Sequence, residues 1–174
     1  FGHAGYYLRK ANVLNEEEAA RAACLGKLTD CCQSLSGEAG ELCTIHGLTS
    51  PNGGFYILCK GNAASPHVSD EVIAQSWVWR SKTKALVFDS IERKENISIP
   101  DNVIVNLYRK LGEIFCNEGY AQNVTCGADS GISSKVGYKE LMAWDTEQFS
   151  DYQGYNDSRK QRIISTNDKL YYLY

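Results

Sequence analysis

Three closely spaced segments rich in apolar, β-branched and aromatic residues constrain this chain more than any other feature. They are GFYILCK (54–60), IAQSWVWR (73–80) and ALVFDSIE (85–92), and polar turns separate them. Runs of this composition divided by turns are typical of antiparallel strands. None of the three has a clean polar face, so other elements must cover both faces of the predicted sheet.

Helical segments precede these strands. Asn15 followed by three glutamates predicts a helix start, because Asn is a good capping residue and acidic side chains favour the first turn. We expect this helix to run from Glu16 to Cys31 or Cys32. A loop and a second short helix, over 41–46, should follow before the turn signal TSPNGG (49–54).

The clearest amphipathic helix follows the three strands. Apolar residues recur at helical spacing from Val103 to Phe115. Asp101 or Asn102 is the expected cap, and Gly119 is expected to end the helix. This helix would cover one face of the sheet.

The remaining elements complete a single domain of 174 residues. GYYLRKAN (5–12) and AQNVTCG (121–127) are expected as strands, GYKELMAW (137–144) as a short helix, and RKQRIIST (159–166) and LYYLY (170–174) as final strands. The predicted fold is an α/β (α+β) sandwich with a mixed, mostly antiparallel sheet and helices on both faces.

Composition excludes several classes of protein. A net charge of -3 gives no electrostatic basis for binding nucleic acid or an anionic membrane. No apolar run approaches the roughly 20 residues of a membrane span. Seven cysteines, an odd number, argue against a disulfide framework and favour a reducing, cytoplasmic environment. The sequons at Asn96 and Asn123 leave a secreted origin open.

The order of these elements resembles that of the GNAT (GCN5-related N-acetyltransferase) superfamily. FYILCK, IAQSWVWR, ALVFDSIE, VIVNLYRKLGEIFCNEGY and AQNVTCG look like that family's strands two to four, following helix and fifth strand. Residues 54–127 carry the resemblance as a core. The helical part 15–47 and the C-terminal part 137–174 belong to the same single domain, 1–174.

The resemblance implies an acyl-CoA-dependent N-acyltransferase acting on an amine of a small molecule or protein. Acetyl-CoA or another acyl-CoA would lie where the fourth and fifth strands part, with its pantetheine hydrogen-bonded to the fourth strand. Its pyrophosphate would meet backbone N–H groups in the loop that opens the next helix. An acidic residue would take the amine proton, and a tyrosine would protonate the leaving thiolate.

Three residues match these catalytic roles. Glu92 or Asp89 would be the general base, and Tyr138 the general acid. In a regular strand Asp89 and Glu92 point to opposite faces, so both cannot reach one substrate. Glu92 can therefore act only if its strand ends or bulges there.

The coenzyme contacts fall on the end of the fourth strand and the loop after it, at Ser90, Ile91, Glu92, Arg93 and Lys94. The loop, RKENISIPDNV (93–103), departs from the family's glycine-rich pattern because it contains no glycine. Pro100 also removes an N–H donor, and Asp101 adds negative charge near the expected diphosphate. This departure favours an alternative function, that of a non-catalytic GNAT-like module that binds a protein partner.

Gln75 and Trp77 have two interpretations. They would line an acceptor pocket in an enzyme. Alternatively, Trp77 is a core aromatic, Gln75 bonds across the sheet and Asp89 pairs with Arg80 from the neighbouring strand.

A second unusual stretch is TDCCQSLSGEAGELCTIHG (29–47). Its cysteines are either buried apolar residues or part of a nucleophilic set, with Cys31 or Cys32 as nucleophile and His46 as base. The second alternative makes the protein a cysteine-dependent hydrolase or transferase. A zinc site drawn from Cys24, Cys31, Cys32, Cys43 and His46 has only one close ligand pair, so no metal is expected.

Overall fold

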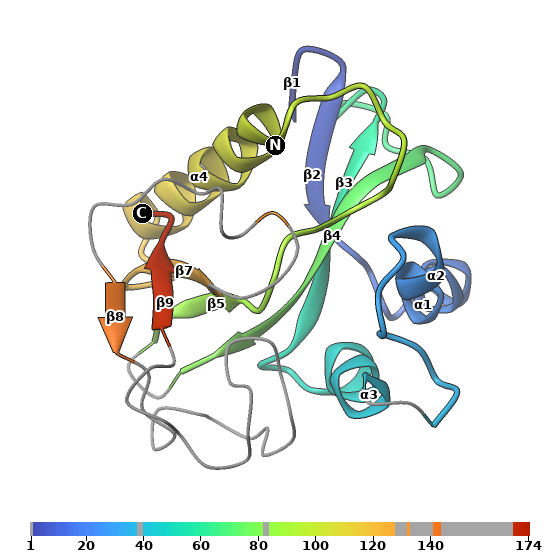
Figure 1. The fold of residues 1–174 in the computed structure, drawn as a ribbon, viewed down its shortest axis with the longest axis horizontal. Coiled ribbons are helices and arrows are strands. Elements are labelled where there is room, and N and C mark those ends of the chain that lie inside the picture. Colours follow the sequence, from blue (N-terminus) through green and yellow to red (C-terminus); the bar gives the residue numbers. More distant parts are fainter. Residues whose placement is uncertain (1, 38–39, 82–83, 128–131, 133–140, 144–168) are drawn as a thin grey trace.

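A single sheet forms the centre of the computed structural model, which describes residues 2–37, 40–81, 84–127, 132, 141–143 and 169–174 (Figure 1). Within this part of the chain the strand order is β1-β2-β3-β4-β5-β7-β9-β8, and β6 also pairs with β4. The strands are β1 (Gly2–His3), β2 (Tyr6–Lys10), β3 (Gly54–Lys60), β4 (Glu71–Arg80), β5 (Leu86–Phe88), β6 (Glu92–Arg93), β7 (Val124–Gly127), β8 (Leu141–Ala143) and β9 (Lys169–Tyr172).

The three segments that led the sequence analysis form the expected antiparallel meander. β3 covers the whole predicted segment 54–60, and Phe55 faces Trp77 of β4. β4 turns back into β5, where Val78 faces Phe88. The prediction of three antiparallel strands with both faces buried is confirmed, since these strands are buried along nearly their whole length.

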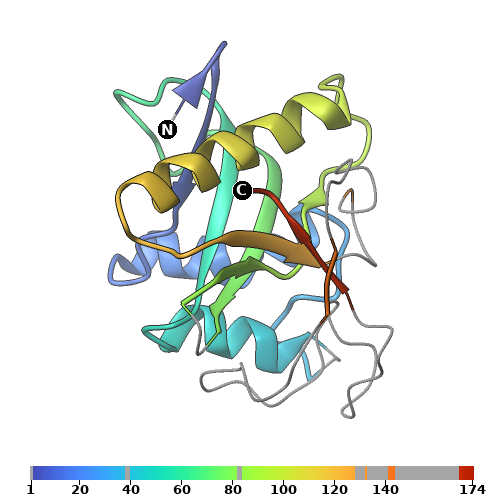
Figure 2. The same ribbon diagram turned by 90° about the vertical axis from the view of Figure 1, so that its left-hand side faces the viewer.

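Helices cover the two faces of the sheet. α4 (Asp101–Asn117) lies on one face, and α1 (Glu16–Ala23), α2 (Leu25–Leu28) and α3 (Glu41–Thr49) lie on the other (Figure 1). Figure 2 shows α4 crossing over the strands. The fold is thus a mixed α+β domain with a curled, mostly antiparallel sheet and helices on both faces, as predicted.

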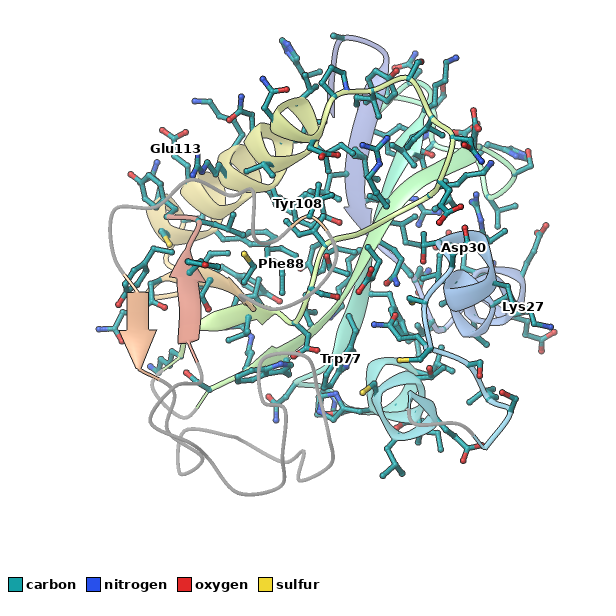
Figure 3. All side chains as sticks on the ribbon, viewed as in Figure 1. Lys27, Asp30, Trp77, Phe88, Tyr108 and Glu113 are labelled. Atoms are coloured by element: carbon teal, nitrogen blue, oxygen red, sulfur yellow. The ribbon has the colours of Figure 1, made fainter. Side chains whose placement is uncertain are left out.

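Two apolar clusters divide the core between these faces. Beneath α4, the Phe88 and Tyr108 rings meet edge to face with centroids 5.0 Å apart, and the Ser76 hydroxyl donates to the Tyr108 hydroxyl at 3.2 Å (Figure 3). On the opposite face, the fully buried Trp77 and Trp79 pack among apolar side chains under α1–α3. Edge-to-face aromatic pairs of this kind stabilise a core beyond their buried area.

The predicted first helix is wrong in its length. The Asn15 side chain caps α1 as expected, accepting from the Glu18 N–H at 3.0 Å. The helix breaks at Cys24, whose N–H turns back to the Arg21 carbonyl, and α2 adds one short turn before Thr29. Asp30 then adopts φ 53°, a left-handed conformation typical of a helix end, and α2 stops at Leu28.

The amphipathic helix is confirmed as α4, with one correction at its start. Neither Asp101 nor Asn102 caps it: Pro100 occupies the N-cap position without a side-chain bond, and Asp101 is the first helical residue. Gly119, at φ 71°, follows the end of α4 as predicted.

The C-terminal predictions have mixed outcomes. β7 is shorter than the predicted strand 121–127. The predicted helix over 137–144 is wrong for 141–143, which form β8 because they pair antiparallel with β9. The final strand is present as β9, whereas the predicted strand 159–166 lies outside the described residues. None of the helices in the described part of the chain is long and apolar enough to cross a membrane.

Candidate active site

A β-bulge lies where the sequence places the strand-end carboxylates. Val78 faces Phe88 in one pairing, and Gln75 faces Glu92 in the next. Three steps along β4 therefore oppose four steps along the other strand, so one extra residue is inserted between Phe88 and Glu92. Such bulges re-aim side chains and often occur beside active sites.

The bulge corrects the expectation that Asp89 and Glu92 lie on opposite faces. Glu92 directly opposes Gln75, and directly opposed residues share a face. Asp89 accepts from the indole N–H of Trp79, which belongs to the cluster under α1–α3. Both carboxylates therefore lie on the α1–α3 side of the sheet.

The two carboxylates differ in their surroundings. Asp89 is fully buried, and its Oδ1 accepts from Trp79 Nε1 at 3.3 Å. It does not form the alternative pair with Arg80, whose guanidinium lies 4.0 Å from the centre of the Tyr120 ring. Glu92 is only half-buried, and its Oε1 accepts from the Ser90 hydroxyl at 2.7 Å. Glu92 is thus the more exposed of the two carboxylates.

Gln75 belongs to a polar cluster on the same face. Its side-chain amide donates to Gln33 Oε1 at 2.7 Å and also lies 3.4 Å from Thr29 Oγ1 and from Cys31 Sγ. Gln75 therefore does not bond across the sheet. It is fully buried, and its Oε1 has no hydrogen-bond partner among the described residues. A buried amide oxygen without a donor is costly unless a water or ligand supplies one.

The end of α2 holds these partners in place. The Cys31 N–H returns to the Gly26 carbonyl at 2.9 Å, and the Thr29 N–H reaches the Leu25 carbonyl at 3.0 Å. The first of these is the 6→1 bond of a Schellman motif, and Asp30, at φ 53°, holds the left-handed position usually taken by glycine. It directs the residues after α2 toward Gln75.

The described parallel pairing next to Glu92 ends close to the position where the family resemblance implies a thioester. β5 pairs in parallel with β7 as far as Phe88 and Cys126. Beyond this point β6 continues along β4 only, among the described strands. Past the end of this pairing, the carbonyl of the buried Ile91 accepts from the Ile132 N–H at 3.0 Å. The bulged strand thus presents a backbone acceptor that pairs with an amide.

Ion pairs tie the loop after β6 to the start of α4 and to β4. The Arg93 guanidinium contacts the Asp101 carboxylate at the start of α4, and its Nη2 donates to the Ile97 carbonyl at 3.0 Å. Lys94 Nζ lies 3.3 Å from Glu71 Oε1. Both basic residues predicted to meet the diphosphate therefore already have acidic partners.

The structure does not assemble Cys31 and His46 into a catalytic pair. His46 Nδ1 accepts from the Trp77 indole N–H at 3.1 Å, while Cys31 is anchored to Gln75. Gln75 and Trp77 are two residues apart on one strand face, a separation of about 7 Å. Burial raises the pKa of the Cys31 thiol to about 11, and the charge of Glu92 adds to the rise. Nucleophilic cysteines need a lowered pKa.

The other cysteine and metal alternatives gain no support. Cys32 is exposed, and none of the seven cysteines forms a disulfide. Within the described residues, no three His, Cys, Asp or Glu side chains gather as a metal site. Trp77 is a fully buried core residue that holds His46, so it does not line an open pocket.

Tyr138, the predicted general acid, lies outside the described residues. Other residues near the site were not predicted from the sequence. Thr29 carried no signal of its own, and neither did Ile132. The bond between Ser90 and Glu92 was not predictable from strand alternation, because the bulge interrupts the regular strand between Phe88 and Glu92.

Comparisons with known proteins add little to this geometry. No protein-family model matches the chain, and no curated protein matches it. Among solved structures, an acetyltransferase from Streptococcus agalactiae 2603 is similar at 11% identity and a TM-score of 0.45, over 98% of each chain. A likeness at this level carries no weight for function, so the function is argued from the site.

Proposed function

We propose that the protein is an N-acyltransferase that moves an acyl group from a thioester to an amine. The observation that carries the proposal is the position of Glu92. It is a half-buried carboxylate on a bulged strand, close to the end of the described parallel pairing of β5 with β7. A strand edge that can hold a thioester arm and a carboxylate that can take a proton thus lie together.

The proposed chemistry needs one base and one proton donor. The amine nitrogen attacks the thioester carbon while Glu92 takes the amine proton, directly or through one water molecule. The C–N bond forms, the C–S bond breaks, and the thiolate leaves with a proton from solvent or from Tyr138. Ser90 holds the Glu92 carboxylate in orientation through the 2.7 Å bond.

The α1–α3 side of the sheet would receive the acceptor. Gln75, Gln33 and Cys31 form a polar layer beneath that side. The acceptor would be an amine of a small molecule or of a protein. Asp89, buried against Trp79, would hold the strand rather than act as the base.

The donor would be acyl-CoA or a related thioester, held by the backbone of Ser90–Glu92. A pantetheine amide paired with the Ile91 carbonyl would take the place of the Ile132 N–H. This exchange would replace one backbone N–H donor by an amide N–H of the arm, so the acceptor suits this half of the donor once the Ile132 N–H is displaced.

A thermal unfolding scan with and without acetyl-CoA tests the proposal. A donor at about 100 times its dissociation constant should stabilise the fold by about 2.7 kcal/mol, which raises the melting temperature by about 5–10 °C. A Glu92→Gln variant should keep most of this shift while losing turnover. Absence of any shift with every thioester tried would contradict the proposal.

A second candidate function is a non-catalytic module that binds a protein partner. The observations that favour it are the Ile132 N–H on the Ile91 carbonyl and the Arg93–Asp101 pair, since both occupy groups that a coenzyme would use. It predicts that no thioester stabilises the fold and that Glu92→Gln changes nothing measurable except local packing.

A further inference from the structure

The loop between β6 and α4 is a poor site for a diphosphate. The segment Arg93–Asp101 carries two basic and two acidic residues, so it has no net positive charge. Arg93 is held by the Asp101 carboxylate and the Ile97 carbonyl, and Lys94 by Glu71. An anion would have to compete with a carboxylate for each cation.

The start of α4 opposes a diphosphate as well. Asp101 places a carboxylate in the first turn, where the helix dipole favours a single negative charge. A phosphate bound there would be repelled by that carboxylate, and Pro100 offers no N–H. The segment contains no glycine to let the backbone approach closely, and Asn96 takes the left-handed conformation at φ 57° in its place.

The loop is also fixed from beneath. Ile99 is buried, and it packs in the core cluster with Ile73 and Ile104. Because these contacts anchor the loop next to α4, opening it there toward a nucleotide would expose apolar surface. The pantetheine end differs, because the Ile91 carbonyl bonds the backbone N–H of Ile132, and an amide of the arm could replace that donor without separating an ion pair.

We propose that the donor is a pantetheine or 4′-phosphopantetheine thioester whose nucleotide the protein does not recognise. This inference rests on the proposed acyl transfer. Recognition would come from the two amides of the pantetheine arm at Ser90–Glu92, with the α4 end contributing nothing. The same arm can be free in solution or attached to a carrier protein.

Donor kinetics with one reactive amine test this directly. The donors are S-acetyl-pantetheine, S-acetyl-4′-phosphopantetheine, the same arm on an acyl carrier protein, and acetyl-CoA. We expect kcat/KM for the free acetyl-phosphopantetheine to lie within about threefold of that for acetyl-CoA. A preference for acetyl-CoA on the order of 100-fold or more would overturn the inference, since two charge-assisted contacts to a diphosphate are worth at least that much.

The remaining outcomes are also decisive. A carrier-bound arm that outperforms the free arm supports the inference and identifies a carrier protein as the source. Equal rates support it with a free thioester as the source. No turnover with any donor, in a folded protein, contradicts the proposed function itself, and the inference falls with it.

A pair of variants on α4 checks the role of Asp101. Asp101→Asn removes the opposing charge and releases Arg93, so it should raise kcat/KM for acetyl-CoA relative to acetyl-pantetheine by about five- to tenfold. Glu113→Gln, which neutralises a carboxylate paired with Lys110 at the other end of the helix, should leave the ratio unchanged. Equal ratios in Asp101→Asn and wild type would contradict a closed diphosphate site.

Discussion

Glu92 and Gln75 face each other across β6 and β4, and the extra residue between Phe88 and Glu92 makes this pairing possible. The pairing places a half-buried carboxylate beside a buried polar cluster built from Gln75, Gln33 and Cys31. In a regular strand Ile91 would take this position, and the cluster would face an apolar side chain.

The bulge leads to a prediction about the two carboxylates. Asp89→Ala should destabilise the fold by about 1–3 kcal/mol, because it leaves the buried Trp79 N–H without this acceptor. Asp89→Asn keeps an acceptor oxygen and should cost less. Urea unfolding of both variants measures the difference. Equal stability of Asp89→Ala and wild type would show that the Trp79 bond contributes nothing.

Cys31 should react slowly with alkylating agents. A pKa of about 11 leaves little thiolate at neutral pH, so iodoacetamide should label Cys31 on the order of 100-fold more slowly than a free thiol. Peptide mass spectrometry of the time course measures the rate, with the exposed Cys24 as the internal reference. Rapid labelling of Cys31 would revive the nucleophilic alternative.

The same experiment reports the distance between Glu92 and Cys31. The Glu92 charge raises the Cys31 pKa, so Glu92→Gln should lower that pKa and increase the Cys31 labelling rate by about two- to fivefold. Glu113→Gln is the matched control on the opposite face. An unchanged Cys31 rate in Glu92→Gln would mean that Glu92 does not face the cluster.

Asp30 should be replaceable by glycine with a gain in stability. It holds φ 53° at the end of α2, a conformation that costs an L-residue about 1–2 kcal/mol and glycine almost nothing. Because glycine loses more entropy on folding, the expected net gain is about 0.5–1 kcal/mol. Asp30→Ala, which keeps the strain, should not be stabilised. If both variants lose stability, the Asp30 side chain itself supports the turn.

The Tyr7–Asp70 bond should appear in the pH dependence of stability. The Tyr7 hydroxyl donates to Asp70 Oδ2 at 2.6 Å, and this bond, with that from the His67 N–H, holds the Asp70 pKa below its ordinary value of 3.8. A depressed carboxylate pKa contributes stability above pH 3.8 that is lost as pH falls through the folded value. Tyr7→Phe should therefore have a lower free energy of unfolding than wild type at pH 7, and this difference should shrink below pH 3.8. A pH-independent difference would point to packing alone.

Element order and burial were predictable from the sequence because the strands are continuous apolar runs bounded by turn residues and α4 has a helical apolar period. The segment 54–60 is such a run, and the helix that ends before Gly119 follows the helical period. The expected fold class therefore agrees with the structure.

Local departures from regular geometry were not predictable. The bulge lies within Asp89–Ile91, and no glycine or proline marks it. The left-handed Asp30 replaces the glycine that would have signalled the end of α2. Residues 141–143 form β8 only through their pairing with β9, a tertiary effect that a short apolar segment does not encode.

One measurement tests the central claim most directly: amine-dependent release of free thiol from acetyl-CoA and from S-acetyl-pantetheine, in wild type and in Glu92→Gln. The account predicts release with a suitable amine in the wild type and a loss of about 10²–10⁴-fold in turnover in Glu92→Gln, with an unchanged melting temperature. Equal thiol release by the two proteins, or none above the uncatalysed rate from a folded wild type across a broad amine panel, would contradict it.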